Sequence, residues 1–130
     1  MPTPETGDPR SYAGATISEL PSLYDGMIKL VRTALDISAF GAQIMDLVPD
    51  YTTRSHDESN SGQQELYVAL SGSGAVVIGD ERLALDGDHL VRVNAGTGRR
   101  LSSGPDGLRV LCIGGVPGAA YEPPDWTDED

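Results

Sequence analysis

Residues 64–72 read Gln-Glu-Leu-Tyr-Val-Ala-Leu-Ser-Gly, and this stretch decides the fold. Its side chains alternate between two faces, with Glu65, Tyr67 and Ala69 on one and Leu66, Val68 and Leu70 on the other. A period of two is typical of a β-strand, because successive side chains of a strand point to opposite faces of the sheet. We expect this strand to end at the Ser-Gly-Ser-Gly run of residues 71–74, which has the composition of a turn.

Short apolar runs bounded by turn residues recur on both sides of this strand. We expect further strands at residues 28–32, 40–48, 75–78, 82–85, 89–93, 99–101 and 108–113, and one helical turn at 33–37. Residues 79–81, which read Gly-Asp-Glu, are expected to form a tight hairpin turn. About eight short strands with almost no helical periodicity are typical of a jelly-roll barrel. The fold class predicted from the residues is therefore all-β.

The 130 residues suffice for one domain. We expect residues 1–16 to form a loose N-terminal arm, residues 17–122 the barrel, and residues 123–130 an acidic C-terminal tail. Residues 121–130 carry five acidic side chains and no basic one, so we expect the tail to be solvated.

Composition argues against several classes of partner. Nine basic against twenty acidic residues give a net charge of −11, and the basic residues are scattered. Nucleic acids and anionic membranes need basic side chains gathered on one face, so neither is expected as a partner. No apolar stretch approaches the roughly 20 residues that span a bilayer, and residues 1–10 lack the pattern of a signal peptide. We expect a soluble, cytoplasmic protein in which the single Cys112 is a buried, inert thiol.

The region around the central strand resembles the two sequence motifs of the cupin superfamily. The first cupin motif is a His-x-His pair, then a Glu, then a Gly seven positions after the Glu. Here Arg54-Ser55-His56 stands at the His-x-His position, followed by Glu65 and Gly72. The second motif runs from Gly-Asp through a short apolar strand and a Pro-x-Gly turn to a His. Here Gly87-Asp88 opens it, residues 94–97 form the turn, and Arg99 stands at the position of the His.

The flanking residues 31–35, 39–41 and 108–118 are similar to those of one small bacterial subgroup of cupins. The resemblance covers roughly residues 20–125, and it implies the cupin double-stranded β-helix, a jelly-roll barrel. It also implies a homodimer. Cupins carry many unrelated activities on one scaffold, so the resemblance alone does not fix the function.

The cupin motifs ordinarily supply three or four metal ligands, and here only His56 and Glu65 remain of them. Two ligands hold a transition metal poorly, and the guanidinium groups of Arg54 and Arg99 repel a cation. We therefore expect no metal cofactor. A divalent metal stays open if Glu58 serves as a shifted ligand beside His56, or if His89 reaches the cavity from the face of Val91 and Val93. Otherwise His56 is a hydrogen-bonded loop residue and His89 an ordinary strand histidine near a turn.

The first functional hypothesis is a binding protein that holds a small anionic organic ligand in the barrel. Its predicted pocket is formed by Arg54, His56, Glu65, Tyr67 and Arg99, because a guanidinium fork suits a carboxylate or phosphate. In the competing interpretation, Glu65 pairs with Arg54 or Arg99 in a structural ion pair. Two further alternatives stay open. One is an enzyme, either a metal-dependent oxygenase or a metal-free isomerase with His56 and Glu65 as acid and base. The other is a structural or assembly protein with a vestigial pocket.

Overall fold

The structure is a computed structural model that describes residues 11–124. Most of the expected N-terminal arm and of the expected acidic tail, residues 1–10 and 125–130, therefore lies outside the described residues. Residues 11–16 are exposed and form neither helix nor strand. No helix within residues 11–124 is long and apolar enough to cross a membrane.

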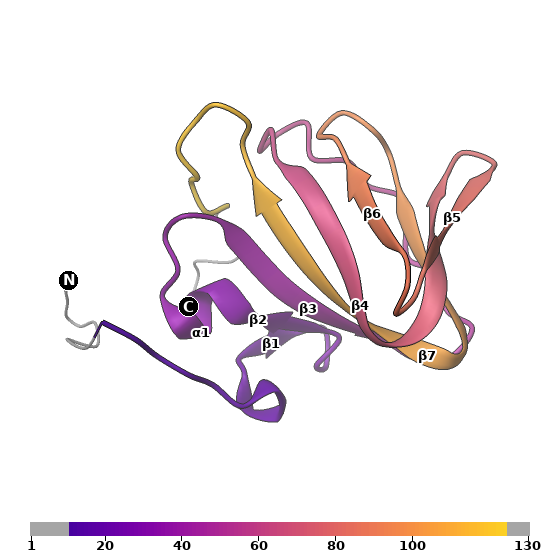
Figure 1. The fold of residues 1–130 in the computed structure, drawn as a ribbon, viewed down its shortest axis with the longest axis horizontal. Coiled ribbons are helices and arrows are strands. Elements are labelled where there is room, and N and C mark those ends of the chain that lie inside the picture. Colours follow the sequence, from indigo (N-terminus) through magenta and orange to yellow (C-terminus); the bar gives the residue numbers. More distant parts are fainter. Residues whose placement is uncertain (1–10, 125–130) are drawn as a thin grey trace.

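Seven antiparallel strands form one strongly bent sheet (Figure 1). The strands are β1 (Ser22–Leu23), β2 (Ile28–Leu30), β3 (Gly41–Leu47), β4 (Gln64–Ile78), β5 (Glu81–Leu85), β6 (Leu90–Val93) and β7 (Arg100–Gly115). They lie in the order β1-β2-β3-β7-β4-β5, and β6 also pairs with β4. A 3₁₀ turn, η1 (Ile17–Glu19), and one short helix, α1 (Val31–Leu35), complete the fold. The all-β class predicted from the sequence is confirmed.

The two long strands β4 and β7 pair with each other along both halves of the barrel. The first half of β4 pairs with β6 on its other side, and the second half pairs with β5. Register shifts between Ala69 and Ser71 and between Gly72 and Gly74 are β-bulges, which bend the pair and fold the sheet back on itself.

The prediction that the strand ends at residue 71 is wrong, because β4 continues through the Ser-Gly-Ser-Gly run. The strands expected at residues 99–101 and 108–113 likewise form one continuous strand, because residues 102–107 between them belong to β7. The glycines of the run allow the backbone of β4 to lie very close to that of β7. A Cβ on Gly72 would collide with the carbonyl oxygen of Gly107, and a Cβ on Gly74 with that of Ser102. Gly72 also has a φ of +76°, which favours glycine.

The two faces of β4 that the alternation predicts differ in burial. Glu65 and Tyr67 are buried, whereas Leu66 and Leu70 are exposed. The core around them is a single apolar cluster of Met45, Leu47, Tyr67, Val76, Leu85, Val91, Val93, Leu101, Leu108, Val110 and Cys112. One face of the sheet therefore encloses the barrel interior.

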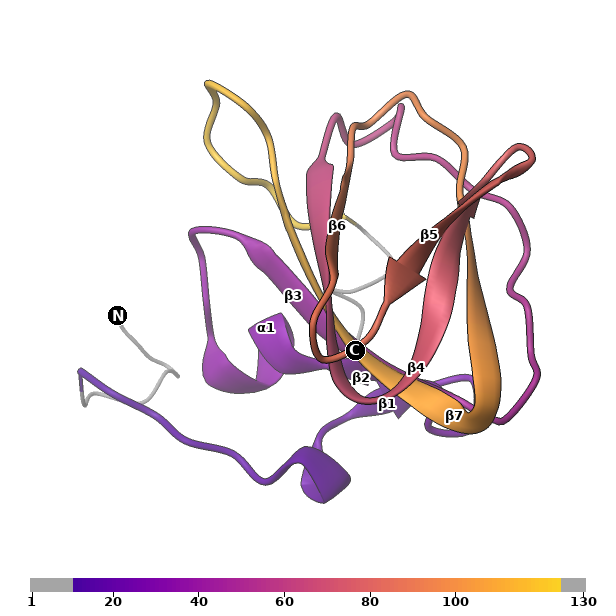
Figure 2. The same ribbon diagram turned by 45° about the vertical axis from the view of Figure 1, so that its right-hand side comes forward.

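Residues 51–56 run antiparallel to the start of β7, although they belong to no regular strand (Figure 2). Bridges join Thr52 to Ser102 and His56 to Arg99, and the amide of Thr53 donates to the carbonyl of Leu101 at 2.9 Å. Residues 52–56 are thus paired with the start of β7. This pairing carries His56 to the mouth of the barrel, next to the start of β4.

Candidate functional site

A cavity of about 390 Å³ opens into the barrel. Its walls come from β2, α1, β3, β4 and β7 and from residues 53–63. Most of the wall is apolar and includes Met27, Ile28, Leu30, Met45 and Leu101. Its acidic and imidazole side chains are His56, Glu58 and Glu65, which we call the polar cluster.

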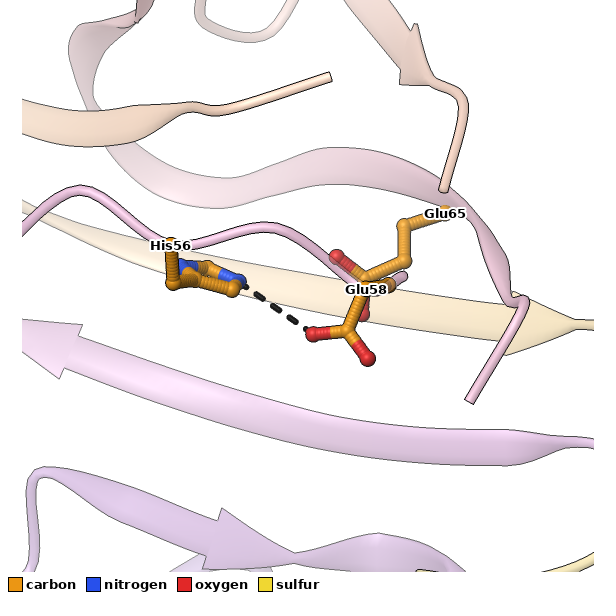
Figure 3. A group of neighbouring side chains, drawn as sticks. All are labelled: His56, Glu58 and Glu65. Atoms are coloured by element: carbon orange, nitrogen blue, oxygen red, sulfur yellow. Dashed lines mark ion pairs between the residues drawn. The ribbon is translucent and has the colours of Figure 1, made fainter. Parts of the chain in front are cut away.

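The polar cluster gathers three possible ligand atoms, all within 4.8 Å of one another. His56 Nε2 lies 3.4 Å from Glu58 Oε2, and Figure 3 shows the imidazole directed toward the two carboxylates. The hydroxyl of Ser61 donates to Glu58 Oε1 at 2.8 Å, and the Glu58 amide donates to the Ala95 carbonyl at 2.8 Å. Glu58 is therefore held in place from both its side chain and its backbone.

Glu65 links the cavity to a buried network behind it. Its Oε1 atom accepts a hydrogen bond from the Tyr67 hydroxyl at 2.6 Å and another from Arg99 Nη1 at 3.1 Å. Arg99 is completely buried, and its Nη2 donates to the carbonyl of Asn94 at 2.7 Å. Because a buried charge needs a partner, this ion pair neutralises both groups where the sequence motif ordinarily places a metal ligand.

The ionisation of the site follows from its burial. Burial opposes the charge on Glu58, but hydrogen bonds from His56 and Ser61 outweigh it and leave the pKa of Glu58 below its ordinary value. Burial raises the pKa of Tyr67 far above its ordinary value, and the nearby Cys112 and Glu65 raise it further. Burial also raises the pKa of Cys112. Tyr67 and Cys112 therefore stay protonated at neutral pH, and Cys112 is a buried thiol as expected, although it lines the cavity.

The structure brings together His56, Glu65 and Tyr67 of the predicted pocket, and all three line the cavity. The prediction that Arg54 lines it is wrong. Arg54 is exposed and lies outside the cavity lining, although His56, two residues further on, is part of it. Arg99 does not line the cavity either, since its guanidinium lies in the network behind Glu65. The competing interpretation, a structural ion pair of Glu65 with Arg99, matches this arrangement.

His89 is also placed away from the cavity, so the prediction that it could reach it is wrong. It is exposed in the turn between β5 and β6, and its Nδ1 atom lies 2.8 Å from Asp86 Oδ1. The hydrogen bond to Asp86 raises the pKa of His89. A strong partner within the turn thus holds this imidazole off the face of Val91 and Val93, which is buried.

Several lining residues were missed from the sequence. Gln63 is buried in the cavity wall, and its position two residues before Glu65 places it on the same face of the chain. The same alternation could have located Cys112, which is paired with Tyr67 across β4 and β7. Arg32 and Thr33 line the cavity from α1, and no pattern in the sequence indicates that this short helix covers it.

The chain matches no family model and no curated protein. Its structure is similar to a cupin protein from Bacteroides fragilis, with 20% identity, 93% of this chain and 97% of that chain covered, and a TM-score of 0.69. It is also similar to a conserved protein with a double-stranded β-helix domain from Klebsiella pneumoniae, with 15% identity, 84% and 96% coverage, and a TM-score of 0.62. An RmlC-like cupin protein from Desulfovibrio desulfuricans matches with 16% identity, 78% and 94% coverage, and a TM-score of 0.59. This chain therefore has the cupin fold, as its two sequence motifs predicted.

Proposed function

We propose that this chain is a binding protein that holds a small organic molecule in the cavity of its barrel without a metal ion. The observation that carries the proposal is the cavity of about 390 Å³, whose apolar walls surround one polar cluster. Sites for small molecules commonly combine apolar walls with a few converging polar groups. In this arrangement the walls bind the hydrocarbon part of the ligand, and His56, Glu58 and Glu65 fix its orientation.

The anionic ligand expected from the sequence depended on Arg54 and Arg99. Neither side chain lines the cavity, and the arginine that does is Arg32. The polar cluster instead presents two carboxylates to the ligand. The proposed binding function therefore stands on the cavity, and the two arginines of the motifs do not support it.

A metal-dependent enzyme is the second candidate, and the polar cluster is the observation that favours it. One imidazole nitrogen and two carboxylate oxygens within 4.8 Å suit a divalent transition metal in number and type. His56, Glu58 and Glu65 would hold the ion, which would supply Lewis-acid or redox chemistry when bound. Against this candidate, the Arg99 guanidinium is bonded to Glu65 at 3.1 Å and opposes a second positive charge there.

The metal content of untagged protein, purified without added metal or chelator, decides between the two candidates. We expect less than about a tenth of an equivalent of metal in the wild type and in His56→Ala alike, because the Arg99 guanidinium bonded to Glu65 opposes a divalent cation. Near-stoichiometric metal in the wild type that is lost in His56→Ala would overturn the metal-free proposal and establish the second candidate.

A screen of small organic molecules by thermal unfolding tests the cavity itself. Ala42 lines the cavity from β3 and is only half-buried, so Ala42→Phe is designed to fill the space without disturbing the core. Compounds that bind in the cavity should raise the Tm of the wild type and leave that of Ala42→Phe unchanged. Compounds that stabilise both proteins equally would show that binding occurs elsewhere.

A further inference from the structure

We infer that the ligand carries a positively charged amino group, which binds Glu58 and Glu65 while an aliphatic or alicyclic body fills the apolar part of the cavity. This inference rests on the proposed binding function and names the chemical class of its ligand. It is drawn from the acceptors, the charge balance and the walls of the cavity.

The polar cluster is rich in acceptors. The bonds from Tyr67 and Arg99 both end on Glu65 Oε1 and leave Glu65 Oε2 out of this network. Glu58 adds two further carboxylate oxygens, of which Oε1 accepts from Ser61 and Oε2 lies beside His56. A carboxylate oxygen accepts more than one hydrogen bond, whereas an ammonium group donates three and accepts none. Acceptors converging on one point therefore match an ammonium group better than a carboxylate or a phosphate.

The charge balance of the same region favours a single positive charge. The carboxylates of Glu58 and Glu65 and the guanidinium of Arg99, which is bonded to Glu65, together carry a formal charge of −1. One ammonium group brings this sum to zero. A divalent metal would leave it at +1 beside the buried guanidinium, and an anionic group would take it to −2. Because uncompensated charge in a partly buried site is costly, the monovalent cation is favoured.

The rest of the cavity sets the body of the ligand. Met27, Ile28, Leu30 and Met45 line it with aliphatic side chains, which offer no hydrogen bond to a polar body. Arg32 is the remaining charged residue of the lining, and its Nη2 atom donates to Thr33 Oγ1 at 3.3 Å. Arg32 could attract an anionic probe, so the test includes an anion for comparison with the amine.

Three probes with the same ring and different head groups test the inference: cyclohexylmethylamine, cyclohexylmethanol and cyclohexanecarboxylate. Their dissociation constants are measured by calorimetry at pH 7 in the presence of a chelator, on the full chain. We expect the amine to bind at least about tenfold more tightly than the other two, because a hydrogen bond between charged partners is stronger than one between neutral groups. Glu58→Gln should remove this preference.

Asp57→Asn is the matched control. Asp57 is the neighbouring carboxylate, is exposed, does not line the cavity, and caps the amide of Ser59 at 3.0 Å, which an asparagine can also do. The amine preference should persist in this variant, and its loss there would mean that general charge attraction explains the binding. Equal binding of the three probes would overturn the amine inference and leave the cavity as the binding site. Binding of none of them would overturn the inference and count against the proposed function as well.

Discussion

Arg99 and Glu65 form a buried ion pair, with Arg99 Nη1 3.1 Å from Glu65 Oε1. The pair joins the residue before β7 to the interior face of β4, and Arg99 Nη2 also donates to the carbonyl of Asn94 at 2.7 Å. In the two cupin motifs that this sequence resembles, the positions of Glu65 and Arg99 are positions of metal ligands. An ion pair between two side chains thus joins β4 to the segment that leads into β7.

Removing one partner of this pair should destabilise the protein strongly. Arg99→Met leaves the Glu65 carboxylate buried without its charge partner, which typically costs about 3–5 kcal/mol. Urea unfolding of the variant measures the change. Arg100→Met is the matched control, because Arg100 is exposed on the neighbouring position, and its effect should stay within about 0.5 kcal/mol. Equal effects of the two substitutions would contradict the role assigned to the buried pair.

Replacing both partners should be far milder than replacing one. In Glu65→Leu/Arg99→Met no charge remains buried, and apolar pairs of similar volume often match or exceed a buried ion pair in stability. We expect the double variant to be more stable than Arg99→Met alone, by about 2 kcal/mol or more. A double variant as unstable as the single one would show that Arg99 acts through packing or through its bond to Asn94.

Tyr67 should give stability a dependence on alkaline pH. The pKa of this phenol is higher in the folded state than in the unfolded state. The protonated phenol therefore contributes fully to the free energy of unfolding below about pH 10, and this contribution is lost as the pH rises further. The phenolate absorbance of Tyr67 should therefore appear only together with unfolding. Tyr67→Phe should weaken this alkaline dependence and cost about 1–1.5 kcal/mol at neutral pH through the lost bond to Glu65. Ionisation of Tyr67 in the folded protein near pH 10 would contradict the prediction.

Asp46 should give stability a dependence on acidic pH. Arg109 donates to it at 2.7 and 3.1 Å and Lys29 lies at 3.0 Å; the hydrogen bond from Arg109 is the largest cause that lowers the pKa of Asp46. Because the folded state lowers this pKa, the ionised Asp46 contributes to the free energy of unfolding at pH values above the unfolded pKa of about 4. This contribution is lost as the pH falls below that value. Because the residues are partly exposed, Asp46→Asn should cost only about 0.5–1 kcal/mol at pH 7. The difference from the wild type should vanish near pH 2, as measured by urea unfolding across this range, and a constant difference would contradict the prediction.

Two glycines with positive φ should respond differently to alanine. Gly72 has a φ of +76° and faces the Gly107 carbonyl, whereas Gly79 has a φ of +59° with open space around it. Gly79→Ala should cost about 1 kcal/mol from backbone strain alone. Gly72→Ala adds a collision with the opposite backbone at the bend and should cost more than about 2 kcal/mol, as judged by thermal unfolding. Similar effects would mean that the bend can relax around a methyl group.

The alternation of residues 65–70 was enough to divide β4 into two faces, and the resemblance to the first cupin motif placed Glu65 and Tyr67 on the face toward the pocket, where both are buried. The second motif was enough to place Arg99 close to His56, and the two residues form a bridge. Both placements came from the resemblance to the cupin motifs, because alternation along one strand shows neither which face is buried nor which distant segment lies beside it.

The direction of the Arg99 side chain was not predictable in the same way. An arginine at that position can reach the ligand or turn back to Glu65, and the choice depends on the Asn94 carbonyl and on the burial around it. The glycines of residues 71–74 led to the wrong prediction of a strand end for a related reason. A glycine-rich run has the same composition in a turn and at the close approach of two long strands, and only the partner strand distinguishes them.

The continuous ladder between β4 and β7 has a consequence for how this protein folds. Its strands lie in residues 64–78 and 100–115. The chain between them must be closed into a loop, at a cost in conformational entropy, before the hydrogen bonds of the ladder can form. Such non-local pairing is expected to make folding slow, on the order of milliseconds to seconds. The same two strands run through both halves of the barrel, so the two halves share one pair of strands. The bend at Gly72 therefore joins the two halves of the barrel, and we expect them to unfold in one cooperative step.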